Sequence, residues 1–179
     1  PPTNGDHPEA KPVFALLSAE LIAAARGLAN GHDHTGNALR GTPTLCLGAV
    51  ANPGVEDQDG ELERLKAKLD AGAEFFQTQA VYDIDQYARF ADRARAMGAK
   101  LLAGIIPLKS AKMAAFLNDK VPGINVPADL MGRIESAEDV TAEAIEIAAD
   151  TIRALDGLTD GVHVMAIGWE DHVPAILEA

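Results

Sequence analysis

The sequence predicts an α/β fold in which parallel strands alternate with helices. Four apolar runs of strand length support this prediction, at residues 44–50, 74–79, 100–106 and 161–167. Each run is separated from the next by a segment with apolar residues at helical spacing. Connections that contain helices of at least ten residues are typical of parallel strands joined by right-handed crossovers.

The helices are predicted from apolar spacing and from residues that begin or end helices. Gly72 and Gly98 are placed to end the segments that precede the second and third strands. Ser136 and Asp139 form a variant of the capping box. The predicted helices are Ser18 to Leu28, a helix starting at Asp59, Asp83 or Asp85 to Met97, Ser110 to Asn118, Pro127 (as the first helical residue) to Ile134, Ser136 to Leu155, and Asp171 to Glu178.

The remaining segments are predicted as loops, and the first strand as a fully buried one. Residues 1–12 and 30–43 are rich in Gly, Pro, Asp, Asn and His. Residues 44–50 form a continuous apolar run, which is typical of a strand buried on both faces. Cys46 lies inside this run and is expected to be a small buried hydrophobe.

Composition limits the classes of function. The chain has 179 residues, enough for one domain with a sizeable core, and its formal net charge is −12. An acidic chain gains no counterion release on nucleic acid or an anionic membrane, so neither is expected as a partner. A single cysteine excludes a disulfide within the chain. No apolar run of about 18 residues and no signal peptide is seen, so a cytoplasmic location is expected.

The pattern leaves two architectures open. Four βα units fit a small doubly wound sheet or half of an eight-stranded barrel. A half barrel has two open edges and an exposed apolar inner face. It is therefore expected to associate with a second copy of itself or with a separate complementary chain.

Gln79 is the best-placed candidate for ligand binding. It ends the second apolar run, and Asp83 begins the next helix. In a (β/α) barrel, side chains at the carboxyl ends of strands face the ligand. This placement favours a ligand contact over the alternative, an ordinary polar residue of a surface loop.

Other polar residues have a functional and a structural interpretation. Arg64 and Lys68 lie four residues apart on a helix and can meet a phosphate, but the residues alone favour a solvated face paired with Glu61 and Glu63. Trp169 either stacks on a planar ligand or packs a helix. No catalytic motif of a serine hydrolase or P-loop nucleotide-binding type is found.

The histidines are interpreted as structural. His32 and His34 flank Asp33 in a loop without a third metal ligand at diagnostic spacing. His7 lies beside Asp6 and Pro8, and His163 lies inside the fourth strand.

Several segments resemble the methylenetetrahydrofolate reductase family, in register over essentially the whole chain. The most specific is residues 66–79, KAKLDAGAEFFQTQ. The others are GDHPEAKPVF at residues 5–14, GAVANP at 48–53, GIIP at 104–107 and GVHVMA at 161–166. The resemblance implies a flavin-dependent TIM barrel that reduces 5,10-methylenetetrahydrofolate to 5-methyltetrahydrofolate, with FAD as cofactor and NAD(P)H as reductant.

The resemblance also implies which part of that barrel is present. Residues 1–179 are expected to form a single domain, the C-terminal half with strands five to eight. The general-acid glutamate of the family and an aspartate near the flavin are expected before Pro1. No catalytic residue is therefore assigned in this chain, which alone is expected to be inactive.

Residue by residue, the resemblance carries over a small set of positions. Gln79 matches the glutamine that contacts folate and nicotinamide. Asn52 matches a flavin-contacting tyrosine of some members, and Glu61, Arg64 and Lys68 fall on the helix that meets the adenosine and phosphate end of FAD. Met113 and Trp169 stand where some members carry a folate-contacting glutamine and arginine, so they weaken the expectation of tight folate selectivity.

Two functions of different classes follow. The first is the flavin-dependent reductase, with this chain supplying half of the active site. The second is a non-catalytic half barrel that binds a nucleotide-like ligand or a partner chain. Bound flavin in the purified protein distinguishes the two.

Overall fold

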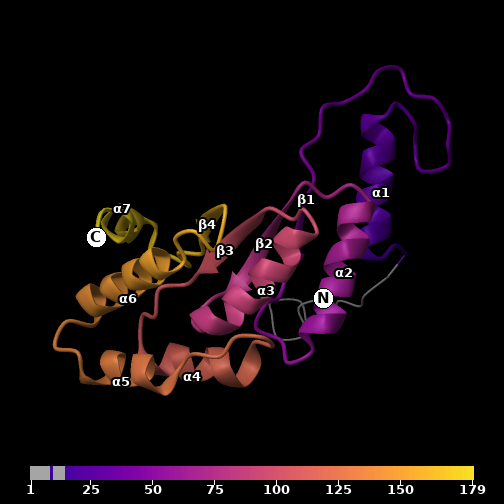
Figure 1. The fold of residues 1–179 in the computed structure, drawn as a ribbon. Helices are drawn as coiled ribbons and strands as arrows, with labels where there is room; N and C mark the ends of the chain where they lie inside the picture. Colours follow the sequence, from indigo (N-terminus) through magenta and orange to yellow (C-terminus); the bar gives the residue numbers. More distant parts are fainter. Residues whose placement is uncertain (1–8, 10–14) are drawn as a thin grey trace. The chain divides into compact units, whose positions relative to one another are not determined.

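The computed structural model describes residue 9 and residues 15–179, and the chain divides into two compact units, residues 1–45 and 46–179 (Figure 1). A single domain over residues 1–179 stays a prediction. The loop predicted for residues 1–12 and the histidine His7 lie outside the described residues.

The described part of the first unit is built around helix α1 (Ser18–Ala29). Its N-cap is Leu17, one residue before the predicted Ser18, and the Glu20 carboxylate accepts a hydrogen bond of 2.7 Å from the Leu17 N–H. In the following loop, the Asp33 carboxylate accepts hydrogen bonds from Asn37 and Thr35. These bonds lower the pKa of Asp33 to about 2, with Asn37 the larger cause.

The second unit contains a four-stranded parallel sheet, as predicted. The strands are β1 (Gly48–Ala51), β2 (Phe75–Ala80), β3 (Leu101–Ile105) and β4 (Gly161–Val164). Their order in the sheet is the order in the chain, β1-β2-β3-β4 (Figure 1). A doubly wound sheet reverses its strand order at a switch point, and this sheet does not. The topology therefore fits a partial TIM barrel.

The helices of the second unit begin close to the predicted positions. They are α2 (Gln58–Asp70), α3 (Ile84–Ala96), α4 (Ala111–Lys120), α5 (Ala128–Ser136), α6 (Val140–Ala154), the 3₁₀ helix η1 (Glu170–His172) and α7 (Val173–Glu178). Asp83 and Ser110 act as N-caps, as predicted, and accept from the backbone N–H groups of Gln86 and Met113.

Several predicted helix starts of this unit were wrong, including the last, where η1 precedes α7 in place of one helix from Asp171. Asp57 caps α2 by accepting from the Gly60 N–H, so the helix begins before Asp59. Pro127 is the N-cap of α5, with the extended backbone that a cap adopts, rather than its first helical residue. Ser136 ends α5 and donates to the Gly132 carbonyl, which leaves Asp139 alone to cap α6.

The two faces of the sheet differ in burial. The side chains of Phe76, Leu101 and Ala103 are fully buried beneath the helices. On the opposite face Val50 is 67% exposed, and Gln77, its partner in register on β2, is also exposed. Within residues 46–179, the helices therefore cover one face of the sheet and leave the other uncovered.

This uncovered face overturns the prediction that the first strand is buried on both sides. Strand β1 has only four residues, lies at an edge of the sheet and has one neighbouring strand. Cys46 precedes it and is exposed rather than buried. An apolar strand is expected to be buried, but among residues 46–179 no segment covers that face of β1, where Val50 is exposed.

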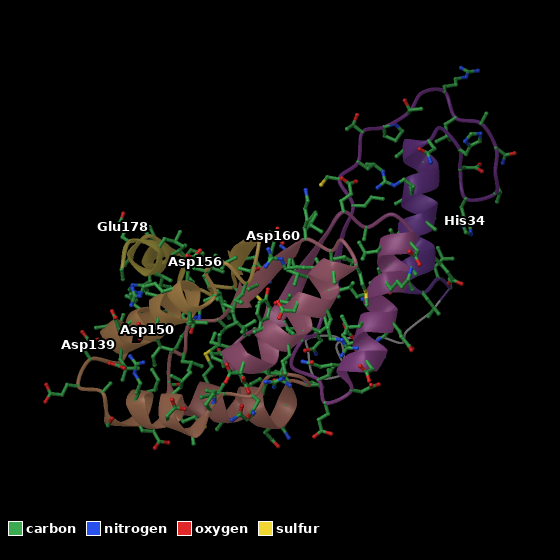
Figure 2. All side chains as sticks on the ribbon, viewed as in Figure 1. His34, Asp139, Asp150, Asp156, Asp160 and Glu178 are labelled. Carbon is green, nitrogen blue, oxygen red and sulfur yellow. The ribbon has the colours of Figure 1, made fainter. Side chains whose placement is uncertain are left out.

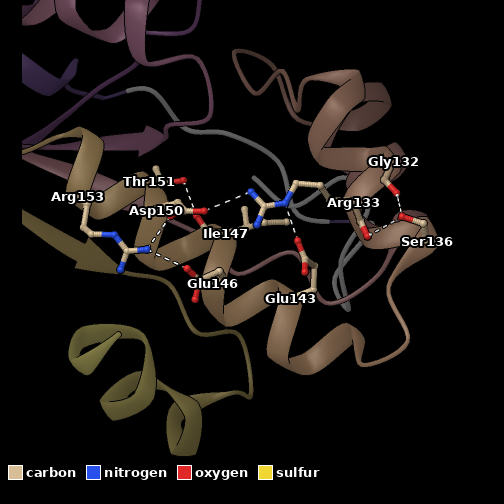
Figure 3. A network of polar contacts seen from close by, with 9 residues as sticks. All are labelled: Gly132, Arg133, Ser136, Glu143, Glu146, Ile147, Asp150, Thr151 and Arg153. Carbon is tan, nitrogen blue, oxygen red and sulfur yellow. Dashed lines mark hydrogen bonds and ion pairs between the residues drawn. The ribbon is translucent and has the colours of Figure 1, made fainter.

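Charged side chains join and surround the outer helices. Arg133 of α5 bonds to Glu143 and Asp150 of α6, and Arg153 bonds to Asp150 and Glu146 (Figure 3). The bond from Arg153, followed by that from Arg133, lowers the pKa of Asp150. Other carboxylates, such as Asp139, Asp156 and Glu178, are exposed (Figure 2).

Within residues 15–179, no helix is long and apolar enough to cross a membrane.

Candidate functional site

A cleft of about 550 Å³ opens on the uncovered face of the sheet, toward the carboxyl ends of the strands. Strands β1, β2 and β4 and helix α2 all contribute to it. The lining residues are Val50, Ala51, Asn52, Glu61, Lys68, Gln77, Thr78, Gln79, His163 and Met165. Clefts of 300–1,000 Å³ are typical of small-molecule sites, and this edge is where (β/α) barrels bind ligands.

Gln79 lies in this cleft, near the carboxyl end of β2, and is half-buried. Its side-chain oxygen Oε1 accepts a hydrogen bond of 3.1 Å from the Ala80 N–H. This bond fixes the orientation of the amide, because a backbone N–H can only donate. The amino group of Gln79 remains to donate to a ligand.

Lys68 is buried, which overturns its interpretation as part of a solvated face. Only 7% of the residue is exposed, and its Nζ donates to the Val50 carbonyl over 2.7 Å. Burial lowers the pKa of Lys68, and the nearby Glu61 carboxylate partly opposes that shift. An ammonium group has three donors, so two remain for an anionic ligand in the cleft.

Glu61 lies near enough to Lys68 to influence its pKa and bonds to two other residues. It is also buried, and its two carboxylate oxygens accept from the Asn52 N–H at 2.9 Å and from Arg64 at 2.8 Å. The Arg64 side chain is 57% exposed and is not part of the cleft lining. Two cations beside one carboxylate leave a local charge of +1 in a chain of net charge −12. An anionic group is therefore favoured at this end of the cleft.

Asn52 lines the cleft, but its side chain is engaged in holding loops together. The Asn52 amide donates to the Pro122 carbonyl over 3.0 Å and accepts from the Gly54 N–H over 3.3 Å. A Cβ atom on Gly123 would lie 2.2 Å from this amide. The Asn52 side chain thus orders the end of β1, and its predicted contact with a flavin stays a prediction.

A local irregularity of β2 places Gln79. The strand register between β2 and β3 shifts between Gln77 and Ala80. At this point the Thr78 hydroxyl accepts from the Gly104 N–H over 3.0 Å and donates to the Gln79 carbonyl over 2.9 Å. An irregularity of this kind re-aims the side chains that follow it, and such features often occur next to ligand sites.

Met113 and Trp169 do not line the cleft. Both are partly buried against an apolar cluster that includes Leu108 and Ala114. The Trp169 ring lies 4.8 Å from the His172 ring, and the Lys109 Nζ lies 5.3 Å from the Trp169 ring centre. Packing against this cluster is therefore the role that the structure gives to Trp169.

The loop histidines bring no metal site together. The His32 Nδ1 lies 3.1 Å from the Asn30 carbonyl, and Asp33 is used by its own turn. In the described part of the chain, no three His, Cys, Asp or Glu side chains form a group that could hold a metal ion.

Four of the five residues assigned from the sequence line one cleft, and Arg64 is the exception. Several other lining residues were not assigned. Thr78 and His163 were not assigned, although a polar residue inside an apolar strand was a usable signal for both. Gln77 offers the same signal and was also not assigned, whereas Val50 and Met165 give none, because each is an apolar residue of a predicted strand. The place of Val50 and Gln77 beside each other follows from strand register.

The arrangement can hold an elongated ligand with an anionic end and an amide-like edge. Lys68 lies at the end that suits phosphate groups, near the ion pair of Glu61 and Arg64. Gln79 and His163 lie along the sheet, where a planar ring would meet polar groups. These residues suit a ligand that carries phosphate groups at one end and a planar ring along its length.

The chain is similar to proteins of one enzyme family. The family profile described as methylenetetrahydrofolate reductase matches residues 41–179. Methylenetetrahydrofolate reductase 2 of Saccharomyces cerevisiae is 30% identical over 155 residues, covering 82% of this chain and 25% of the yeast protein. The 5,10-methylenetetrahydrofolate reductase of Escherichia coli is 30% identical over 117 residues, covering 61% of this chain and 39% of that enzyme.

A solved structure shares the fold. It is described as an uncharacterized protein from Clostridium thermocellum that binds two copies of 5-methyl-5,6,7,8-tetrahydrofolic acid. The TM-score is 0.55 at 22% identity, over 74% of this chain and 51% of that one. This chain spans between a quarter and two fifths of the length of the yeast and bacterial reductases. With a family match over most of its length, the chain belongs to the methylenetetrahydrofolate reductase family.

Proposed function

We propose that this chain supplies the C-terminal half of a flavin-dependent TIM barrel that reduces 5,10-methylenetetrahydrofolate to 5-methyltetrahydrofolate. The observation that carries the proposal is the shared cleft of Lys68 and Gln79 in a member of this reductase family. FAD is the proposed cofactor, NAD(P)H the reductant and the cytoplasm the location.

The residues have separate roles in this proposal. Bound FAD would supply the chemistry by accepting a hydride from the nicotinamide and passing it to the folate. Lys68, with Arg64 held by Glu61, binds the phosphate groups. Gln79 donates from its amino group to the nicotinamide and to the folate in turn. The buried Glu61 holds Arg64 through an ion pair of 2.8 Å and places a negative charge near Lys68.

A direct test is the absorbance of the purified complete protein, meaning this chain together with the complementary barrel half, whether that half is encoded in the same chain or in a separate one. We expect a yellow protein with the absorbance bands of oxidised flavin. The bands should bleach when NADH or NADPH is added without oxygen, and return when 5,10-methylenetetrahydrofolate follows. A colourless protein that stays free of flavin after incubation with FAD would support the other candidate, a non-catalytic half barrel.

The uncovered sheet face leads to a prediction about assembly. In the described part of the second unit, Val50 and its register partner Gln77 are exposed on that face. We expect this chain to form dimers or to bind a complementary half barrel, because exposed strand edges and apolar faces favour association. Sedimentation velocity at micromolar concentration measures this. A stable, well-folded monomer would contradict the half barrel.

A further inference from the structure

We infer that His163 and Thr78 are positioning residues that aim Gln79 into the cleft. The expected effects on turnover rest on the proposed function. The contact between His163 and Thr78 does not. The His163 Nε2 lies 2.9 Å from the Thr78 carbonyl oxygen, although 85 residues separate the two in the chain.

The path of this contact crosses the sheet. His163 lies on β4 and pairs in register with Gly104 on β3, whereas Thr78 lies on β2. The imidazole therefore reaches over β3 to a carbonyl two strands away. It can do so because Gly104 has no side chain. A Cβ atom at that position would lie 2.6 Å from the same Thr78 oxygen.

The contact replaces a bond of the regular parallel ladder. The Gly104 N–H donates to the Thr78 hydroxyl instead of to a β2 carbonyl, and the next ladder bond runs from the Val81 N–H to the Gly104 carbonyl over 2.9 Å. Without His163, the Thr78 carbonyl would lose its donor at a part-buried position, which is unfavourable. The irregularity that places Gln79 thus depends on all three strands.

The bond also selects the tautomer of the neutral imidazole. A carbonyl oxygen only accepts, so the hydrogen of a neutral His163 must be on Nε2. Its other nitrogen, Nδ1, has no hydrogen-bond partner among the described residues. The ring is thus held by one nitrogen while it lines the same cleft as Gln79.

The test is a double-mutant cycle in the complete protein, with His163→Leu, Gln79→Ala and the double variant. We expect His163→Leu to lower turnover about tenfold, because small displacements of a positioned group slow reaction strongly. The same change should have almost no effect when Gln79 is already alanine. His163→Gln places an amide donor near the lost Nε2 and should recover most of the activity. Additive losses, or no loss in His163→Leu, would overturn the inference.

A second readout does not depend on activity. The side-chain amide signals of Gln79 in a ¹H–¹⁵N NMR spectrum are identified by their loss in Gln79→Glu. They should shift in His163→Leu and in Gly104→Ala, and return toward the parent position in His163→Gln. Unshifted signals in folded His163→Leu protein would refute the positioning role. Absent reductase activity with shifted signals would refute only the proposed function.

Discussion

Replacement of Gln79 by glutamate in the complete enzyme is expected to slow both halves of the reaction, by about 10- to 100-fold. The carboxylate of Gln79→Glu can still accept from the Ala80 N–H, so the local backbone should be retained. The variant loses the amino group that donates to the ligand, and it adds a negative charge. Losing such a hydrogen bond in a buried site costs about 1–3 kcal/mol. Anaerobic stopped-flow spectroscopy measures flavin reduction by NAD(P)H and reoxidation by folate separately.

The matched control for this change is Gln86→Glu. Gln86 lies in the first turn of α3 and does not line the cleft, so the same substitution there should leave both rates close to the parent. Flavin content and thermal stability of Gln79→Glu should also match the parent. Normal turnover in Gln79→Glu, or a defect limited to misfolding, would make Gln79 a structural residue.

The order of elements was predictable because local signals are strong in this chain. Asp83 and Ser110 cap helices as the sequence indicated, and the four apolar runs are the four strands. Asp57 was missed in favour of Asp59 because several acidic residues stand close together at that helix start. Such choices depend on backbone geometry rather than on residue type.

Burial was less predictable than element order. Cys46 and Val50 have the composition of a core strand, yet the uncovered face leaves both exposed. Lys68 has the pattern of a surface helix, yet it reaches the Val50 carbonyl and is buried. The contact between His163 and Thr78 joins strands that are not neighbours. Contacts of this kind depend on how the strands are arranged in the sheet. The spacing of apolar residues along the sequence does not predict that arrangement.

The burial of Lys68 changes which substitution tests phosphate binding. Charge reversal would place a second carboxylate beside the buried Glu61, and the resulting repulsion would destabilise the fold. Lys68→Met is the better variant, since methionine fills the space of the lysine stem without the charge. We expect FAD affinity to fall about 10- to 100-fold, from the loss of roughly 1.5–3 kcal/mol for a charged hydrogen bond. Fluorescence titration of the apoprotein with FAD measures this.

Lys66→Met is the matched control on the same helix. Lys66 is 58% exposed and pairs with Asp70 on the surface, so its replacement should leave FAD affinity unchanged. If Lys68→Met and Lys66→Met bind FAD as tightly as the parent, Lys68 has no part in holding the phosphate groups. In that case its ammonium serves only the Val50 carbonyl and Glu61.

The pH dependence of stability gives Lys68 a second, ligand-free signature. Burial lowers the pKa of Lys68 in the folded protein below the usual 10.5, which applies to the unfolded chain. Between the folded and the unfolded pKa, the unfolded chain therefore holds a proton that the folded protein has released. The free energy of unfolding should therefore gain a contribution that rises with pH through this interval. Lys68→Met should lack that rise, whereas Lys66→Met should keep it. Urea unfolding of the three apoproteins across this alkaline range measures the difference, and parallel curves for parent and Lys68→Met would show that the ammonium is not desolvated.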